Sequence, residues 1–201
     1  MNDSALFRST RLIDRLRSRL LVIDVQQKLV PAIHRGEDIV RRITFLLNAA
    51  QYLEVPVFVS EQYPQGLGPT VPQLAGHPAI GTMFDKVRFS AADRFCEHIA
   101  INSDTAPDAH DGRDQVILVG MESHVCVLQS AFDLMARGFR VFVADDTTGS
   151  GNQIDHETSM QRLQNAGATI CTAESIAFEW CETAETECFK AISKLVRALR
   201  A

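Results

Sequence analysis

The sequence predicts an α/β fold: a single-domain three-layer αβα sandwich around a central, mainly parallel, doubly wound sheet. Short apolar runs rich in β-branched residues alternate with segments of helical periodicity, which is typical of βαβ crossovers with helices on both faces of a parallel sheet. The length of 201 residues suits one domain with a substantial core. No internal repeat, low-complexity tract or linker divides the chain.

The first half of the chain begins with a fully apolar strand. The run LLVID (20–24) lacks alternation, as expected of a strand covered on both faces. Residues 37–53 place apolar side chains on one helical face. The further strands expected here are 55–60 and 83–87, and residues 61–82 form a long loop rich in proline and glycine. Loops of that length in compact domains are commonly functional or disordered.

The second half repeats the alternation. The expected elements are helix 90–100, strand 115–120, a helix that begins near Cys126, strand 140–145, helix 155–167, strand 168–171 and a C-terminal helix over 173–200. A glycine ends the helix over 155–167, as is common at helix C-termini. We divide the chain into an N-terminal segment (1–17), one domain (18–175) and a C-terminal helix packed on that same domain (176–201).

The charge of the chain disfavours two classes of partner. The formal net charge is −5 and the isoelectric point is near 5.7, so neither nucleic acid nor an anionic membrane is expected to bind. The basic stretch 8–19 contains Asp14 and lacks a long apolar run, which favours a solvated N-terminal segment over a targeting presequence. No apolar run approaches the ~20 residues that a membrane-spanning helix needs.

The cysteines favour a reducing compartment. There are five, an odd number, with irregular spacing and no CxxC pair. Neither a zinc site nor a dithiol redox motif is therefore indicated. A cytoplasmic location is the simplest setting for such a set of thiols.

Polar residues follow several of the expected strands, where ligands bind in sheets of this kind. Asp24 closes the first strand, Lys86 lies in or just after 83–87, and Cys126 follows strand 115–120. Neither GxGxxG nor GxxxxGKS follows any strand, so a dinucleotide or P-loop site has little support. The pair Asp145–Asp146 is read as turn and cap chemistry rather than as a phosphate receiver.

The position of Cys126 has two readings. Free cysteine is among the most buried residue types, so the thiol could simply pack in the core. A helix N-terminus also lowers the pKa of a thiol and so creates a nucleophile. The position by itself leaves these alternatives open.

Three segments resemble the isochorismatase-like cysteine hydrolases, a superfamily that includes the nicotinamidases. They are LLVIDVQ with Asp24, FDKVRFSA with Lys86, and VGMESHVCVLQSAFDLMARGFRVFVADD with Cys126. Their order and spacing match the Asp–Lys–Cys triad of that family over about residues 18–175, so 18–175 is read as an isochorismatase-like hydrolase domain. The loop SEQYPQGLGPTVP resembles the isochorismatase domain-containing protein 2-like branch, for which a physiological substrate is usually not assigned.

The resemblance implies a role for each triad residue. Cys126 attacks a carbonyl carbon as thiolate, Asp24 accepts the thiol proton and returns it to the leaving group, and Lys86 stabilises the thiolate. Each residue also has a plain alternative: a turn cap for Asp24, a surface salt bridge for Lys86 and an inert core thiol for Cys126. The thiol pKa is expected to fall because of Lys86 and the helix N-terminus.

The resemblance also implies the backbone of the site. The Met121–Glu122 peptide bond is expected to be cis, which would turn the amides of Glu122 and Cys126 toward the substrate carbonyl as an oxyanion hole. Metal-binding nicotinamidases carry a DxH pattern where this chain reads SEQYP. The resemblance therefore implies no metal and no cofactor.

These features predict a metal-independent cysteine hydrolase that cleaves a small amide, or less favourably an ester or vinyl ether, through a thioester on Cys126. Gln62, Tyr63 and Phe84 are candidate substrate contacts, with core packing the plainer role for Phe84. A homo-oligomer is expected from the family. The alternatives are a non-catalytic or redox-responsive small-molecule-binding protein that uses Cys126 as a low-pKa sensor, and a purely structural oligomer subunit.

Overall fold

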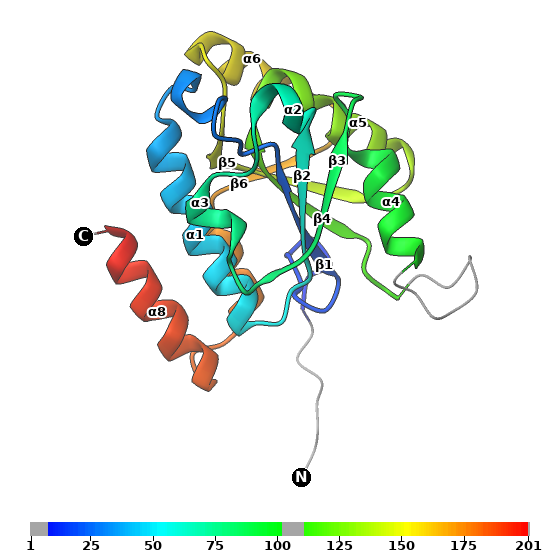
Figure 1. Ribbon diagram of the computed structural model, residues 1–201. Helices are drawn as coiled ribbons and strands as arrows, with labels where there is room; N and C mark the ends of the chain where they lie inside the picture. The colour runs from blue at the N-terminus through cyan, green and yellow to red at the C-terminus, as the bar shows by residue number, and fades with distance from the viewer. Residues whose placement is uncertain (1–7, 102–110, 201) are drawn as a thin grey trace.

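The structure, a computed structural model, describes residues 8–101 and 111–200. Those residues form a parallel sheet in the order β3-β2-β1-β4-β5-β6, flanked by helices on both faces (Figure 1). The strands are β1 (Ser18–Ile23), β2 (Val57–Gln62), β3 (Ile80–Lys86), β4 (Gln115–Met121), β5 (Arg140–Gly149) and β6 (Thr169–Cys171). The predicted three-layer α/β sandwich is confirmed.

The helices fall into two layers. The longer ones are α1 (Gly36–Tyr52), α4 (Ala92–Ile101), α5 (Leu128–Ala136), α6 (Gln153–Asn165), α7 (Ala173–Cys181) and α8 (Glu187–Arg200). Short turns are the 3-10 helix η1 (Val30–Ala32), α2 (Pro64–Leu67), α3 (Pro72–Ala75) and the π-helical turn η2 (Ser123–Val127). Helices α1, α7 and α8 pack over one core, and α4, α5 and α6 over the other.

Strand β1 lies in the interior of the sheet, where the direction of winding reverses. From β1 the chain adds β2 and β3 on one side, and it then returns across β1 to add β4, β5 and β6 on the other. Ligands in open α/β sheets bind beyond the carboxyl ends of strands at such a reversal. Asp24 follows β1 and Cys126 follows β4, so the topology brings both residues to one crevice.

The apolar run of β1 is explained by burial on both faces. Leu20 and Val22 belong to the core beneath α1, α7 and α8, whereas Leu21 and Ile23 belong to the core beneath α4, α5 and α6. Successive side chains of a strand point to opposite faces. A strand covered on both sides therefore needs apolar residues at every position.

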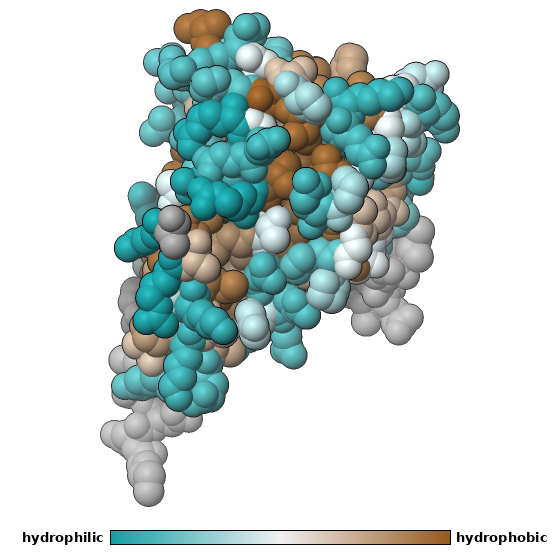
Figure 2. Space-filling model, turned by 60° about the vertical axis from the view of Figure 1, so that its left-hand side comes forward, coloured by the Kyte–Doolittle hydropathy of each residue, from teal (hydrophilic) through white to brown (hydrophobic). Residues whose placement is uncertain are grey.

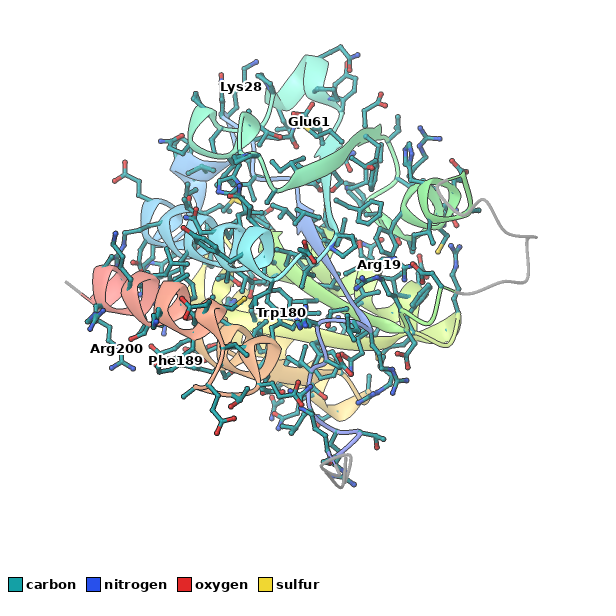
Figure 3. All side chains as sticks on the ribbon, turned by 90° about the horizontal axis from the view of Figure 1, so that it is seen from below. Arg19, Lys28, Glu61, Trp180, Phe189 and Arg200 are labelled. Carbon is teal, nitrogen blue, oxygen red and sulfur yellow. The ribbon has the colours of Figure 1, made fainter. Side chains whose placement is uncertain are left out.

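The C-terminal residues fold as two helices rather than one. Glu182 ends α7 with a φ of 66°, and this left-handed conformation turns the chain into α8. Trp180 of α7 points into the interior (Figure 3), where its indole N–H donates to Ser18 Oγ at 3.0 Å. Helix α8 packs against α1 and α7 and shares their apolar core.

Two further segments differ from the sequence predictions. The long loop 61–82 contains α2, α3 and the beginning of β3. The stretch before β1, expected to be solvated, buries Ile13, whose backbone N–H donates to Glu179 of α7 at 2.6 Å. Residues 1–7 of that segment lie outside the described residues.

The side of the molecule that carries α1 and α8 is largely hydrophilic, with apolar side chains visible between the polar ones (Figure 2). A groove between η1, α1 and α3 is lined partly by Val30, Val40 and Val71. No helix within residues 8–101 and 111–200 has both the length and the apolar character needed to cross a membrane.

Gly120 allows β4 to approach β1 at the entrance to the crevice. Its φ is 114°, a conformation that favours glycine. A Cβ at this position would lie 2.0 Å from the carbonyl oxygen of Ile23, far inside van der Waals contact. The two strands can therefore stay in register here only without a side chain.

We predict that Gly120→Ala lowers the free energy of unfolding by about 3 kcal/mol or more, because backbone strain and a collision with Ile23 add together. Gly167→Ala is the matched control: its φ is 102° and a Cβ there would have no heavy atom within 4 Å. The control should lose only about 1 kcal/mol. Urea unfolding measures both, and equal losses would contradict the steric explanation.

Candidate active site

Asp24 is the first residue after β1 and is completely buried. It adopts a left-handed conformation with φ 53°, which is uncommon for a residue other than glycine. One carboxylate oxygen accepts a hydrogen bond from Ser60 Oγ at 2.7 Å, and the other accepts one from Lys86 Nζ at 2.6 Å. A buried carboxylate needs both a counter-charge and hydrogen bonds, and Asp24 has both.

Lys86 is the last residue of β3, and only 1% of its side chain is exposed. Besides Asp24, its ammonium donates to Gln62 Oε1 at 2.7 Å and to the carbonyl oxygen of Phe89 at 2.9 Å. These partners satisfy the three donors of an ammonium group. The alternative of a surface lysine in a local salt bridge is therefore wrong.

Two glutamines fix the segment around Lys86. Gln62 accepts from Lys86 through Oε1, and its Nε2 donates to the carbonyl oxygen of Val87 at 2.7 Å. Gln26 Nε2 donates to the carbonyl oxygen of Gln62 at 3.0 Å, and Gln26 Oε1 accepts from the backbone N–H of Gln62 at 2.8 Å. The sequence predicts that Gln62 contacts substrate. In the structure, its side-chain amide is instead hydrogen-bonded to Lys86 and to the backbone of Val87.

Cys126 lies within η2, between β4 and α5. The residue is 6% exposed, and its thiol interacts with both the Asp24 carboxylate and the Lys86 ammonium. Three side chains from separate crossovers thus meet at one buried point. The alternative of a core thiol with only apolar neighbours does not describe Cys126.

The electrostatics of the site differ from the sequence prediction. Burial raises the pKa of the Cys126 thiol to about 12; the negative charge of Asp24 adds to the rise, and Lys86 opposes it. The sequence predicts a lowered thiol pKa, but desolvation outweighs the ammonium in the resting site. Cys126 also lies ahead of α5 rather than at its first residue.

Asp24 has a raised pKa as well. Burial raises the pKa of its carboxyl group above the usual value, and the charge of Lys86 works in the opposite direction. The Cys126 thiol and the Asp24 carboxyl group both resist ionisation, and they compete for one proton beside the ammonium group of Lys86. Transfer of that proton from sulfur to oxygen leaves the total charge of the three groups unchanged.

Residues 122–126, called here the nucleophile loop, begin with the cis peptide bond Met121–Glu122. The carbonyl oxygen of Glu122 accepts from the backbone N–H groups of Val125 and Val127, at 3.1 and 3.2 Å. Among the described residues, no acceptor binds the backbone N–H of Glu122. The resemblance implies this N–H as one donor of the oxyanion hole, together with that of Cys126.

The remaining candidate contacts, Phe84 and Tyr63, differ in exposure. Phe84 is 6% exposed and stacks on His98 with ring centroids 5.1 Å apart, so it packs in the core, which is the plainer of its two expected roles. Tyr63 follows β2 and is 55% exposed. Of the predicted substrate contacts, Tyr63 alone has a side chain at the surface and available to a ligand.

The place where nicotinamidases carry a metal-binding DxH pattern holds a different arrangement here. Glu61 Oε1 accepts from both the backbone N–H and the hydroxyl of Thr70, at 2.6 and 2.7 Å, so it fixes the loop after β2. Within the parts of the chain that the structure describes, no three His, Cys, Asp or Glu residues are grouped as a metal site requires.

The fold and these residues define an α/β protein with a buried Asp–Lys–Cys site. A family model described as the isochorismatase domain matches residues 18–175. The chain therefore belongs to the isochorismatase domain family. This membership supports a hydrolase activity for the protein.

Similar proteins carry several names. Isochorismatase domain-containing protein 2A of Mus musculus is 34% identical over 186 residues, covering 90% of this chain and 82% of that protein. A solved structure described as MAR1 ribonuclease from Caenorhabditis elegans is 34% identical, with a TM-score of 0.84 and 92% of each chain covered. The Escherichia coli YcaC gene product, described as an octameric hydrolase of unknown specificity, shares the fold at 22% identity, with a TM-score of 0.83 and coverage of 96% and 95%.

We predict that Lys86→Met lowers the free energy of unfolding by about 3–5 kcal/mol, because it leaves Asp24 buried without its counter-charge. The double variant Asp24→Asn/Lys86→Met removes both charges and should recover at least about half of that loss. Urea unfolding followed by circular dichroism measures both variants. Wild-type stability of Lys86→Met would show that the pair does not carry buried charge.

Proposed function

We propose that this protein is a metal-independent cysteine hydrolase that cleaves a small amide through a thioester on Cys126. The observation that carries the proposal is that the buried Cys126 thiol interacts with both Asp24 and Lys86, which are themselves hydrogen-bonded to each other. A base, a cation and a nucleophile that interact with one another are what covalent acyl transfer requires. Burial raises the pKa of the Asp24 carboxyl group, which makes Asp24 a stronger base than an exposed aspartate.

In the first half of the reaction, Asp24 takes the proton of the thiol and Cys126 Sγ attacks the substrate carbonyl carbon. The S–C bond forms as the carbonyl π electrons move to oxygen. The oxyanion is bound by the backbone N–H groups of Glu122 and Cys126. Collapse of this intermediate breaks the C–N bond, and the amine leaves with the proton that Asp24 held.

In the second half, a water molecule replaces the amine. Asp24, again ionised, takes a proton from the water molecule while the water oxygen attacks the thioester carbonyl carbon. Collapse breaks the C–S bond, releases the carboxylic acid, and Asp24 returns its proton to the sulfur. Lys86 remains charged throughout and stabilises whichever neighbour carries the negative charge.

Two other functions have less support. A redox sensor needs a thiol with a low pKa, whereas burial raises the pKa of Cys126 to about 12. A relative from Caenorhabditis elegans is called a ribonuclease, but the net charge of −5 gives this chain no attraction to RNA. The buried Asp24 and Lys86 also favour a small substrate over a polymer.

Self-association and a cytoplasmic location remain predictions from the family resemblance and the cysteine content. The exposed Tyr63 remains a candidate contact for substrate. The partners we propose are therefore a small-molecule substrate and copies of this chain.

Intact-mass spectrometry after mixing with a panel of small amides and esters tests the covalent step. We predict an added acyl group on Cys126 and complete loss of turnover in Cys126→Ala. Cys171→Ala is a matched control, since burial also raises the pKa of that thiol to about 12, but its charged neighbours are carboxylates such as Glu179 rather than a lysine. Full turnover by Cys126→Ala would refute the proposal.

We predict opposite effects of Asp24→Asn on thiol reactivity and on turnover. Removing the Asp24 charge lowers the pKa of Cys126, because that charge raises it while Lys86 lowers it. Alkylation by iodoacetamide near neutral pH should therefore accelerate about 10-fold or more, with its pH profile shifted to lower pH. Amide turnover should fall about 10²–10⁴-fold because the proton acceptor is lost.

The matched variant is Lys86→Met, in which the thiol pKa should rise and alkylation should slow. Rates measured from about pH 6 to pH 10 separate the two effects. Identical pH profiles in Asp24→Asn and the wild type would mean that Asp24 does not interact with the sulfur.

A further inference from the structure

The nucleophile loop is tied to one distant segment by three hydrogen bonds. This segment, residues 150–156, leads from β5 into the first turn of α6 and is called here the clamp segment. The three bonds are Gly151 N–H to Glu122 Oε1 at 3.1 Å, Ser123 Oγ with His156 Nδ1 at 2.9 Å, and His124 Nδ1 with Ser150 Oγ at 2.9 Å. Three consecutive residues of the loop that carries the proposed oxyanion hole are thus held from one side.

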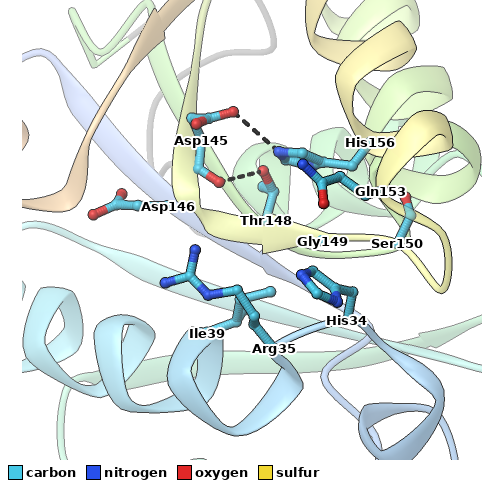
Figure 4. A pocket seen from close by; sticks show the side chains of 10 residues that line it. All are labelled: His34, Arg35, Ile39, Asp145, Asp146, Thr148, Gly149, Ser150, Gln153 and His156. Atoms are coloured by element: carbon cyan, nitrogen blue, oxygen red, sulfur yellow. Dashed lines mark hydrogen bonds and ion pairs between the residues drawn. The ribbon is translucent and has the colours of Figure 1, made fainter.

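His156 is the member of the clamp segment that is itself anchored. Its Nε2 lies 3.1 Å from Asp145 Oδ1 (Figure 4). The hydrogen bond from His156 lowers the pKa of Asp145, so the carboxylate stays charged. Asp145, His156 and Ser123 form a continuous chain from β5 to the nucleophile loop.

This chain has the composition of a serine-hydrolase triad, but Ser123 has no exposed surface. A substrate carbonyl has no route to its hydroxyl. Ser123 instead lies directly after Glu122, whose N–H is a proposed oxyanion donor, and three residues before Cys126. A constraint on Ser123 is a constraint on the backbone between the two donors.

A cavity of about 120 Å³ lies beside the clamp segment (Figure 4). Its lining includes His34, Arg35, Asp146 and Gln153 together with the anchored pair. Since open space adjoins the imidazole, close packing does not hold His156 on that side. On that side, its two hydrogen bonds set the position of the ring.

We infer that His156, anchored by Asp145, is a positioning residue that holds the Glu122 and Cys126 amides in place through Ser123. The inference rests on the proposed function, because it concerns the oxyanion hole of that reaction. Loss of one oxyanion donor typically costs about 10²–10³ in rate, and a displaced donor costs less. We expect about a 10-fold effect when the His156 constraint is removed.

Two thiol reagents distinguish an effect on the oxyanion-hole amides from an effect on the reactivity of the Cys126 sulfur. Cys126 Sγ, having given its proton to Asp24, adds to the β-carbon of acrylamide. The S–C bond forms, the C=C π electrons shift into the bond between the α-carbon and the carbonyl carbon, and the carbonyl π electrons move to oxygen to give an enolate. The α-carbon then takes the proton that Asp24 held, and the carbonyl re-forms. Iodoacetamide reacts by displacement: the S–C bond forms as iodide leaves, and no charge develops on oxygen. Only the acrylamide reaction should therefore depend strongly on an oxyanion hole.

The experiment measures the rate of Cys126 alkylation by each reagent in the full chain. In His156→Ala, acrylamide addition should slow about 10-fold while iodoacetamide displacement changes less than about 2-fold. His156→Asn, whose amide can still reach Ser123, should recover most of the acrylamide rate. Gln153 lines the same cavity but bonds Glu157 within α6, so Gln153→Ala should match the wild type.

Asp145→Asn weakens the anchor at its other end and should also slow acrylamide selectively, which provides a second test if His156→Ala does not fold. Wild-type rates with both reagents in both variants would overturn the positioning role alone. An equal fall of both rates would also overturn it, because the effect would then be on the thiol. Inertness of wild-type Cys126 to both reagents would instead overturn the proposed function and this inference with it.

Discussion

The buried ion pair between Asp24 and Lys86 is the constraint on which the rest of the site depends. Its two charges lie at the end of β3 and directly after β1, two strands that are separated by β2 in the sheet. From the intervening β2, Ser60 donates a hydrogen bond to Asp24 and Gln62 accepts one from Lys86. Burial of either charge without the other would cost several kcal/mol, so the stability of the site depends on β1 and β3 bringing the two residues together.

The pair also determines how Cys126 can react. Because burial and the neighbouring carboxylate keep its thiol protonated at rest, the sulfur is protected from oxidation until a proton acceptor takes its hydrogen. Asp24 is that acceptor in the proposed mechanism. Lys86 makes the transfer possible by remaining beside whichever partner becomes negative, so no isolated charge is created in a region of low dielectric.

Much of the fold follows from local patterns. The unbroken apolar run of β1 and the helical spacing of α1 are visible in the printed sequence, because burial on two faces or on one stripe imposes them. The break at Glu182 lacks a glycine or proline signal, so the sequence predicts one C-terminal helix where there are two. The proline and glycine content of residues 61–82 predicts a loop, so the sequence does not predict α2, α3 or the beginning of β3 there.

The site was predictable only in part. The order of Asp24, Lys86 and Cys126 follows from the resemblance to a family, and the strand ends bring them to one crevice. The role of Gln62 and the bond between Ser123 and His156 depend on contacts between segments far apart in the chain, and no local pattern encodes them. The raised thiol pKa likewise depends on the depth of burial, which a sequence does not state.

The protonation state of the resting thiol is the most direct test of this mechanism. The S–H stretching band of Cys126, identified by its loss in Cys126→Ser, can be followed by infrared spectroscopy between about pH 6 and pH 9. A thiol that ionises only by giving its proton to Asp24 should keep this band at constant intensity across the range. Disappearance of the band within it would mean that Cys126 is a free thiolate at rest, and the shared-proton mechanism would be wrong.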